Sequence, residues 1–219
     1  MKLYGYWRSS AAYRVRIALN LKKIAYEYIA VDLLKDGGEQ HSDDFHQINA
    51  TELVPVLVDG DMRISQSLNI IDYLDDHYFP PQLTPVAGQD RYTAKEIAQD
   101  IAIDIHPLNN LRVQQYLISQ EEFTEQDELD WVKHWIMVGF EALEEKLLRS
   151  SGAYCVGTQL TVADVCLVPQ VYNALRFGVD LSFYPTIERL YHSLNEMSEF
   201  KLAAPENQPD APTKKPPIE

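Results

Sequence analysis

The sequence predicts an α/β domain, residues 1–82, followed by an all-helical domain, residues 87–219. Short strand-like and helix-like segments alternate as far as His77, and apolar residues recur at helical spacing through most of the remainder. Between these parts, residues 79–85 contain three prolines, which neither continue a helix nor complete a strand ladder. We therefore expect an interdomain linker there.

The first domain is expected to be thioredoxin-like. Its segments follow the order βαβ and then ββα, with a turn at residues 36–38 and a hairpin around Asp59-Gly60-Asp61. Strands are predicted at residues 2–7, 25–31, 54–58 and 62–64, and helices at residues 11–21 and 67–77.

The second domain is predicted to contain five helices and to end in a loosely held tail, the proline-rich residues 203–219. A capping box marks the start of the fourth helix, where the Asp164 carboxylate reaches back to the Thr161 amide and Leu160 and Val165 occupy the flanking staple positions. The helices are predicted at residues 91–105, 107–120, 125–150, 162–177 and 185–197.

Charge and composition limit the possible functions. The net charge of -14 disfavours nucleic-acid binding, which needs a basic face. The sequence shows neither a signal peptide nor an apolar run long enough to span a membrane, so we expect a cytoplasmic protein without membrane association. Cys155 and Cys166 are flanked by apolar residues and are predicted to be reduced core thiols, with no metal site.

Two predicted helix starts are suited to anionic groups, and the first lies in a basic region, since residues 1–23 hold six basic side chains and no acidic one. Ser9 and Ser10 precede one helix and Gln66-Ser67 opens another, so unpaired amides and the positive end of the helix dipole lie beside hydroxyl groups. Such a position lowers the pKa of a bound thiol. Helix capping is the competing role, and the two roles are compatible.

Two further features of this region need a structural explanation. Arg14 and Arg16 lie early in the first helix, where a cation opposes the dipole, so we expect an anionic ligand or a buried ion pair to compensate. Val54-Pro55 precedes a short apolar strand, and a cis bond there would turn the Val54 backbone outward, where an extended peptide can pair with it.

Residues 9–19, Ser-Ser-Ala-Ala-Tyr-Arg-Val-Arg-Ile-Ala-Leu, resemble the signature of the zeta-class glutathione transferases, Ser-Ser-Cys-x-x-Arg-Val-Arg-Ile-Ala-Leu. The resemblance extends over most of the chain apart from the tail. It implies the glutathione transferase fold, glutathione as cofactor, a homodimer, and the isomerisation of maleylacetoacetate to fumarylacetoacetate in tyrosine and phenylalanine catabolism. The other segments that carry it are Lys35–Gly38, Val54-Pro55, Gln66-Ser67, His106–Leu111 and Cys155–Gln170.

The resemblance also implies roles for individual residues. Ser9, with Ser10 beside it, would donate to the glutathione sulfur, and Arg176 and Arg14 would lie near a carboxylate of a small dicarboxylate substrate. The residues implied to contact glutathione are Ser9, Gln40, Val54, Pro55, Gln66, Ser67, His106 and Asn110.

One position departs from the signature, because Ala11 stands where the class has a cysteine. The loss of this thiol disfavours thiol-transfer and dehalogenation chemistry. Isomerisation is less affected, since its nucleophile is the thiolate of glutathione rather than a group of the protein.

Three alternative functions remain open from the sequence. Maleylpyruvate isomerisation uses a similar dicarboxylate. Conjugation of glutathione to an electrophile is another, in which Tyr4 or Tyr6 replaces Ser9 as the activator of the sulfur. The third is a non-catalytic binding protein with a transferase-like fold.

Overall fold

A computed structural model describes residues 1–212, which form two compact units. Residues 1–81 and 197–212 make up the first unit, and residues 82–196 the second. The C-terminal segment therefore packs with the first unit, although we expected it to continue the helical domain.

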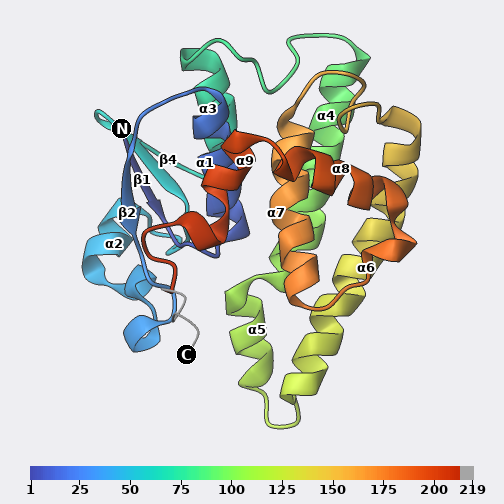
Figure 1. The fold of residues 1–219 in the computed structure, drawn as a ribbon. Helices are drawn as coiled ribbons and strands as arrows, with labels where there is room; N and C mark the ends of the chain where they lie inside the picture. The colour runs from blue at the N-terminus through green and yellow to red at the C-terminus, as the bar shows by residue number, and fades with distance from the viewer. Residues whose placement is uncertain (213–219) are drawn as a thin grey trace, which may run out of the picture. The chain divides into compact units, whose positions relative to one another are not determined.

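A four-stranded mixed sheet organises the first unit, in the order β2-β1-β3-β4 (Figure 1). β1 pairs in parallel with β2 and antiparallel with β3, and β3 pairs antiparallel with β4. The ends of β1, β2 and β4 and the start of β3 consequently lie at the same end of the sheet. The strands are β1, Lys2–Gly5; β2, Glu27–Ala30; β3, Val56–Asp59; and β4, Met62–Ser65.

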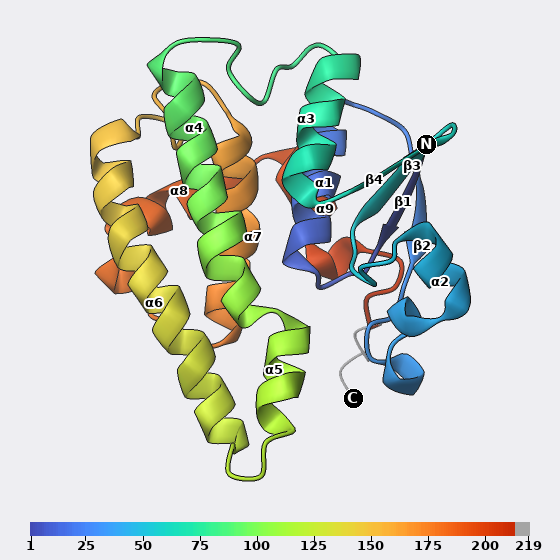
Figure 2. The same cartoon turned by 180° about the vertical axis from the view of Figure 1, so that it is seen from behind.

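Helices cover this sheet, and Figure 2 shows α1 and α3 together, apart from α2. α1 is buried over most of its length and packs against α3 and α9. The predicted order βαβ followed by ββα is confirmed, so the unit has the thioredoxin-like fold. The helices are α1, Ser10–Leu21; α2, Asp43–Ile48; α3, Ser67–His77; and α9, Ser198–Ala203.

The expectation of a loose tail at residues 203–219 is wrong for residues 203–212. Ala203 is buried, and a 3₁₀ helix, Pro205–Asn207, follows it. Asp210 then accepts hydrogen bonds from the Trp7 amide (2.8 Å) and the Tyr28 hydroxyl (3.3 Å). These long-range contacts hold the segment in place despite its prolines. The rest of the predicted tail, residues 213–219, lies outside the described part of the chain.

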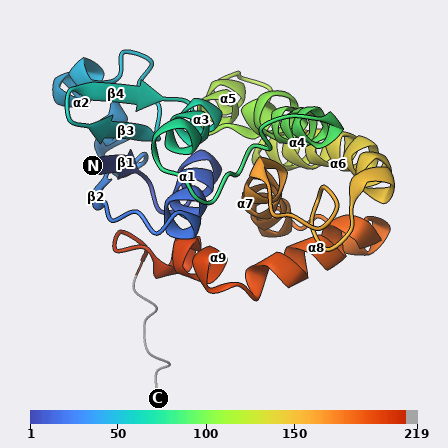
Figure 3. The same ribbon diagram turned by 90° about the horizontal axis from the view of Figure 1, so that it is seen from above.

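The second unit is helical, as predicted. Figure 3 shows its α7 between α4 and α8, and most residues of α7 are buried. A π-helix, Asp100–Ile105, and a 3₁₀ helix, His106–Asn109, follow α4, so the predicted helix 91–105 changes its hydrogen-bonding pattern at Asp100. The α-helices are α4, Gln89–Gln99; α5, Leu111–Ile118; α6, Glu125–Ser150; α7, Val162–Arg176; and α8, Pro185–Asn195.

The predicted capping box at the start of α7 is present and buried. The carboxylate of Asp164 accepts hydrogen bonds from the amides of Thr161 and Cys155, both at 2.8 Å. Cys155 and Cys166 are fully buried and not disulfide-bonded, as predicted. No helix within residues 1–212 is both long and apolar enough to cross a membrane.

A buried ion pair links the end of α1 to α3. Lys22 Nζ lies 2.9 Å from Asp75 Oδ1, and both side chains are almost fully excluded from solvent. The same ammonium donates to the carbonyls of Tyr78 (2.8 Å) and Pro81 (2.6 Å). This cation therefore holds together α1, α3 and the chain that leaves α3.

We predict that Lys22→Met lowers the free energy of unfolding by about 3–5 kcal/mol, because it leaves the Asp75 carboxylate buried without its cation. Urea unfolding monitored by circular dichroism measures this. The double variant Lys22→Met/Asp75→Leu should recover much of the loss. Lys35→Met, which breaks the exposed pair with Glu39 (3.0 Å), is the matched control and should change stability little. Equal losses in both single variants would contradict the prediction.

Candidate active site

The topology of the sheet gathers several predicted site residues at one end. Ser9 follows β1, Val54 precedes β3, and Gln66 follows β4 directly. Because these ends of the strands coincide, the three positions lie along one edge in the strand order β1-β3-β4. An extended ligand crossing this edge would meet each of them in turn.

Ser9 is the N-cap of α1. Its Oγ accepts a hydrogen bond from the amide of Ala12 at 3.2 Å, so capping is confirmed. A hydroxyl that accepts one bond still carries its own proton, which can be donated to a ligand. Ser10 is the first residue of the helix and is buried. The site therefore combines a hydroxyl donor with the positive end of a twelve-residue helix.

The loop before Ser9 is fixed by the buried guanidinium of Arg16. It donates to the carbonyls of Trp7 (2.9 Å), Tyr6 (3.4 Å) and Ala203 (3.0 Å). Backbone carbonyls thus surround Arg16, where we expected an anionic ligand or an ion pair. Burial lowers the pKa of Arg16 from its usual value, while Asp210 acts in the opposite direction.

Arg14, one turn into the same helix, is also buried, and its Nη1 donates to Ser67 Oγ at 3.1 Å. This bond connects α1 to the first residue of α3. The preceding residue, Gln66, has a φ of 70°, a left-handed conformation that is uncommon for residues other than glycine. Backbone strain of this kind is concentrated at ligand-binding positions, and here it directs the chain into the start of α3.

The Val54-Pro55 peptide bond is cis, which is the form that turns the Val54 backbone outward. Pro55 and Val56 are buried, whereas Val54 is half-buried next to them. Tyr4 packs edge-on against Phe45 in the same apolar cluster. This packing gives Tyr4 a structural role.

Gln40 is buried in the 3₁₀ helix Glu39–His41, which lies between β2 and α2. A Cβ atom on Gly38 would collide with the Gln40 amide, and Gly38 has a φ of 114°. Glycine is therefore required two residues before Gln40. The Gln40 amide contacts the neighbouring histidine, with its Nε2 3.0 Å from His41 Nε2.

His106, Asn110 and Arg176 belong to the second unit. Half-buried His106 opens the 3₁₀ helix, and Asn110 is the N-cap of α5, its Oδ1 accepting from the Arg112 amide at 3.2 Å. Arg176 ends α7 with an exposed side chain over the Phe177 ring. The participation of these residues in a common site stays a prediction.

Sequence reasoning missed Asp210, which holds the Trp7 amide two residues before Ser9. It also missed the histidines of residues 41–46 that surround Glu52. A lone aspartate in a proline-rich tail gives no recognisable signal. The histidines and Glu52 lie between the turn predicted at residues 36–38 and the strand predicted at residues 54–58, in a stretch for which no element was predicted.

Comparison with known proteins agrees with this geometry. Residues 3–82 match the family model "Glutathione S-transferase, N-terminal domain". A "Probable maleylacetoacetate isomerase" of Vibrio cholerae is 56% identical over 95% of this chain and 97% of its own length. A solved maleylpyruvate isomerase, described as a bacterial zeta-class glutathione S-transferase, is 41% identical with a TM-score of 0.93, covering 97% of this chain and 100% of that one.

The chain belongs to the zeta class of the glutathione transferases.

A second solved zeta-class relative contains ligands. It is the maleylacetoacetate isomerase of Methylobacterium extorquens AM1 with bound malonate and glutathione, 38% identical with a TM-score of 0.93 over 97% of this chain and 100% of that one. The zeta-class assignment accounts for the thioredoxin-like first unit and the helical second unit.

We predict that Asp210→Ala lowers the free energy of unfolding of this zeta-class protein by about 1–3 kcal/mol, because two half-buried donors lose their charged acceptor. Thermal and urea unfolding measure the change. Asp210→Asn keeps an amide oxygen and should lose less. If Asp210→Ala unfolds like the unsubstituted protein, the tail contact does not contribute to stability in solution.

Proposed function

We propose that this zeta-class protein catalyses the glutathione-dependent cis–trans isomerisation of maleylacetoacetate to fumarylacetoacetate. The observation that carries the proposal is the position of Ser9 at the start of α1, at the edge of the sheet where Val54 and Gln66 also lie. The 56% identity to a probable maleylacetoacetate isomerase supports the choice of substrate.

Glutathione fits the residues present at the sheet edge. Gln66 and Ser67 offer the first amides of α3 to a carboxylate, and Arg14 orients the Ser67 hydroxyl (3.1 Å). Val54 offers its backbone to an extended peptide. We therefore assign the γ-glutamyl end of glutathione to the β4 side of the sheet edge and its cysteinyl unit to Val54. The glycyl end of the tripeptide then lies on the β2 side, where we assign it to Gln40.

The protein's first task is to keep the glutathione sulfur anionic. Ser9 Oγ donates its proton to the sulfur while the α1 amides and dipole favour the charge. Lowering a thiol pKa from about 8.5 by about two units requires about 2.7 kcal/mol. One hydrogen bond to a charged group contributes about 1.5–3 kcal/mol, so Ser9 and the helix start together are sufficient.

The second task is to hold the substrate while its double bond rotates. When bound, glutathione supplies the thiolate that adds reversibly to that double bond. Arg176, an exposed cation at the end of α7, pairs with a substrate carboxylate. The resemblance implied that Arg14 lies near the substrate. We propose instead that the buried Arg14 orients the Ser67 hydroxyl through its hydrogen bond. His106 and Asn110 complete the site as glutathione contacts.

Maleylpyruvate isomerisation is the second candidate, because a solved maleylpyruvate isomerase matches with a TM-score of 0.93. Both substrates present carboxylates to the same cation. The similarity to these isomerases disfavours two other functions, conjugation of glutathione to an electrophile and a non-catalytic binding role. A homodimer and a cytoplasmic location are part of the proposal.

We predict that Ser9→Ala lowers kcat/KM for maleylacetoacetate by about 10–10²-fold, since the hydrogen bond that holds the glutathione sulfur as thiolate, about 1.5–3 kcal/mol, is lost. The ultraviolet absorbance of the bound thiolate should fall with it. Ser10→Ala and Tyr6→Phe are the matched controls and should lose less. A larger loss in Tyr6→Phe would contradict the role of Ser9, and no turnover of maleylacetoacetate or maleylpyruvate by the unsubstituted protein would contradict the proposed function.

We predict that Arg176→Ala raises KM for the substrate about tenfold or more, because a charged hydrogen bond to its carboxylate is removed. The affinity for glutathione, measured by calorimetry, should stay within twofold of the unsubstituted value. Arg176→Lys keeps the charge and should show an intermediate KM. Unchanged kinetics in Arg176→Ala would remove Arg176 from the substrate site.

A further inference from the structure

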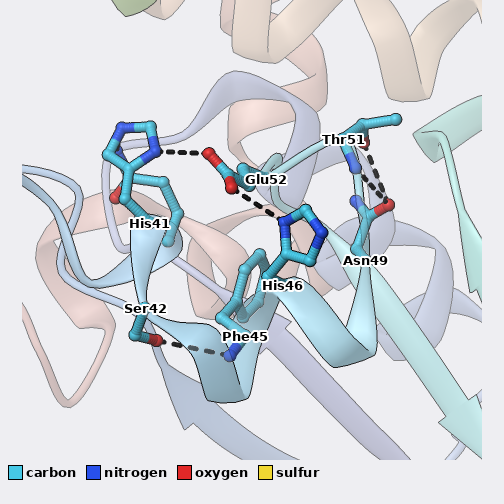
Figure 4. A network of polar contacts seen from close by, with 8 residues as sticks. His41, Ser42, Phe45, His46, Asn49, Thr51 and Glu52 are labelled. Atoms are coloured by element: carbon cyan, nitrogen blue, oxygen red, sulfur yellow. Dashed lines mark hydrogen bonds and ion pairs between the residues drawn. The ribbon is translucent and has the colours of Figure 1, made fainter.

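A chain of polar contacts runs from Gln40 across the surface of the first unit. Gln40 Nε2 lies 3.0 Å from His41 Nε2, and His41 Nδ1 lies 2.6 Å from Glu52 Oε2. The other oxygen of Glu52 meets His46 Nδ1 at 2.9 Å. Figure 4 shows the two imidazoles on either side of this single carboxylate. This series of contacts therefore begins at the buried Gln40 and continues through the exposed His41 and then Glu52 to the exposed His46.

Glu52 is held firmly between the histidines. Its φ is 55°, a left-handed conformation that glutamate adopts rarely and that persists only where the surroundings enforce it. Hydrogen bonds from His41 and then His46 hold the pKa of Glu52 below its ordinary value. The carboxylate is consequently ionised at neutral pH and can only accept hydrogen bonds.

The contact with Glu52 fixes the tautomer of His41. A nitrogen 2.6 Å from an ionised carboxylate oxygen must carry a proton, so Nδ1 is the donor. In a neutral ring, Nε2 is then an acceptor and takes a hydrogen bond from the Gln40 amide nitrogen. This arrangement leaves Gln40 Oε1 buried and without a partner among the described residues.

Protonation of His41 reverses this contact. Nε2 becomes a donor, and the Gln40 nitrogen is also a donor, so the amide must turn over until its oxygen accepts from the ring. The amide nitrogen then takes the buried position that Oε1 held. Gln40 would thus present an acceptor beside a neutral His41 and a donor beside a protonated one.

We infer that His41, held by Glu52, is a positioning residue that sets which end of the Gln40 amide faces glutathione. The inference rests on the proposed function, in which Gln40 lies at the glycyl end of the tripeptide. A carboxylate only accepts hydrogen bonds, so it binds the donor orientation better. Since histidine is the side chain that changes charge between pH 5 and 8, glutathione binds more tightly as the pH falls through this range.

The charged groups on the elements next to His41 are partly paired with one another. Lys35 and Glu39 pair with each other at 3.0 Å and offset each other's charge. Arg63 of β4 donates to the Gln47 carbonyl (2.8 Å). The remaining charged or titratable side chains on these elements are Asp36, Asp43 and Asp44, which are acidic, and His46, which shares the Glu52 carboxylate with His41.

The test measures binding of S-methylglutathione by calorimetry at pH 5.5, 6.5 and 7.5, because this ligand has no thiol to ionise. We expect the Kd of the unsubstituted protein to rise about three- to tenfold from pH 5.5 to 7.5, the effect of one hydrogen bond. His41→Phe should lose most of this rise, because no ring nitrogen then fixes the orientation of the Gln40 amide. Gln40→Ala should be equally insensitive to pH.

Two further variants separate positioning from a structural effect. Glu52→Gln should move the rise in Kd to lower pH, because the carboxylate that favours the imidazolium is removed. His192→Gln is the matched control, since His192 is an exposed histidine with a glutamate neighbour, Glu188 at 3.9 Å, in the second unit. It should keep the unsubstituted pH profile.

The outcomes distinguish this inference from the proposed function. A pH-independent Kd in the unsubstituted protein, or an unaltered profile in His41→Phe, overturns the role of His41 while the glutathione site stands. If the folded, unsubstituted protein does not bind S-methylglutathione at any of the three pH values, the proposed glutathione site is overturned and the role of His41 with it.

Discussion

The position of Ser9 depends on one buried cation, the guanidinium of Arg16. Arg16 has no acidic partner in direct contact within residues 1–212, and it donates to three carbonyl oxygens, two of which belong to Tyr6 and Trp7. A buried guanidinium is tolerated only when its donors are satisfied, so its surroundings can adopt few other arrangements. Asp210 fixes the same loop by accepting a hydrogen bond from the Trp7 amide. Ser9 follows immediately and takes its place from these contacts.

The fold was largely predictable because it rests on local patterns. The helix at residues 67–77, the hairpin around Gly60 and the buried capping box of Asp164 all follow from spacing and turn chemistry. The helix α2 was missed, since six residues opened by Ser42 carry too little periodicity to be recognised. α9 was missed for the same reason, and its packing against α1 depends on long-range contacts.

The site was predictable to a lesser degree. Ser9 and Ser67 were recognised because a serine between a strand pattern and a helix pattern is a known signal for the start of a helix. The partners of Arg16 were not, since a backbone carbonyl carries no residue-specific signal and comes from any residue that the fold brings close. Asp210 and Glu52 were missed for a related reason. Asp210 contacts Trp7, which is far away in the sequence, and the contacts of Glu52 with His41 and His46 follow no helical or strand spacing, so both pairings appear only in three dimensions.

Ala11 has a consequence for the chemical durability of the protein. The sequence contains only two cysteines, and both are fully buried, where burial raises the pKa of Cys155 and keeps its thiol protonated. Oxidants and alkylating compounds react with accessible thiolates, so they find no ready cysteine target on the polypeptide. The reactive sulfur arrives with each molecule of glutathione and leaves with it. Damage to that sulfur therefore consumes a replaceable metabolite and spares the enzyme.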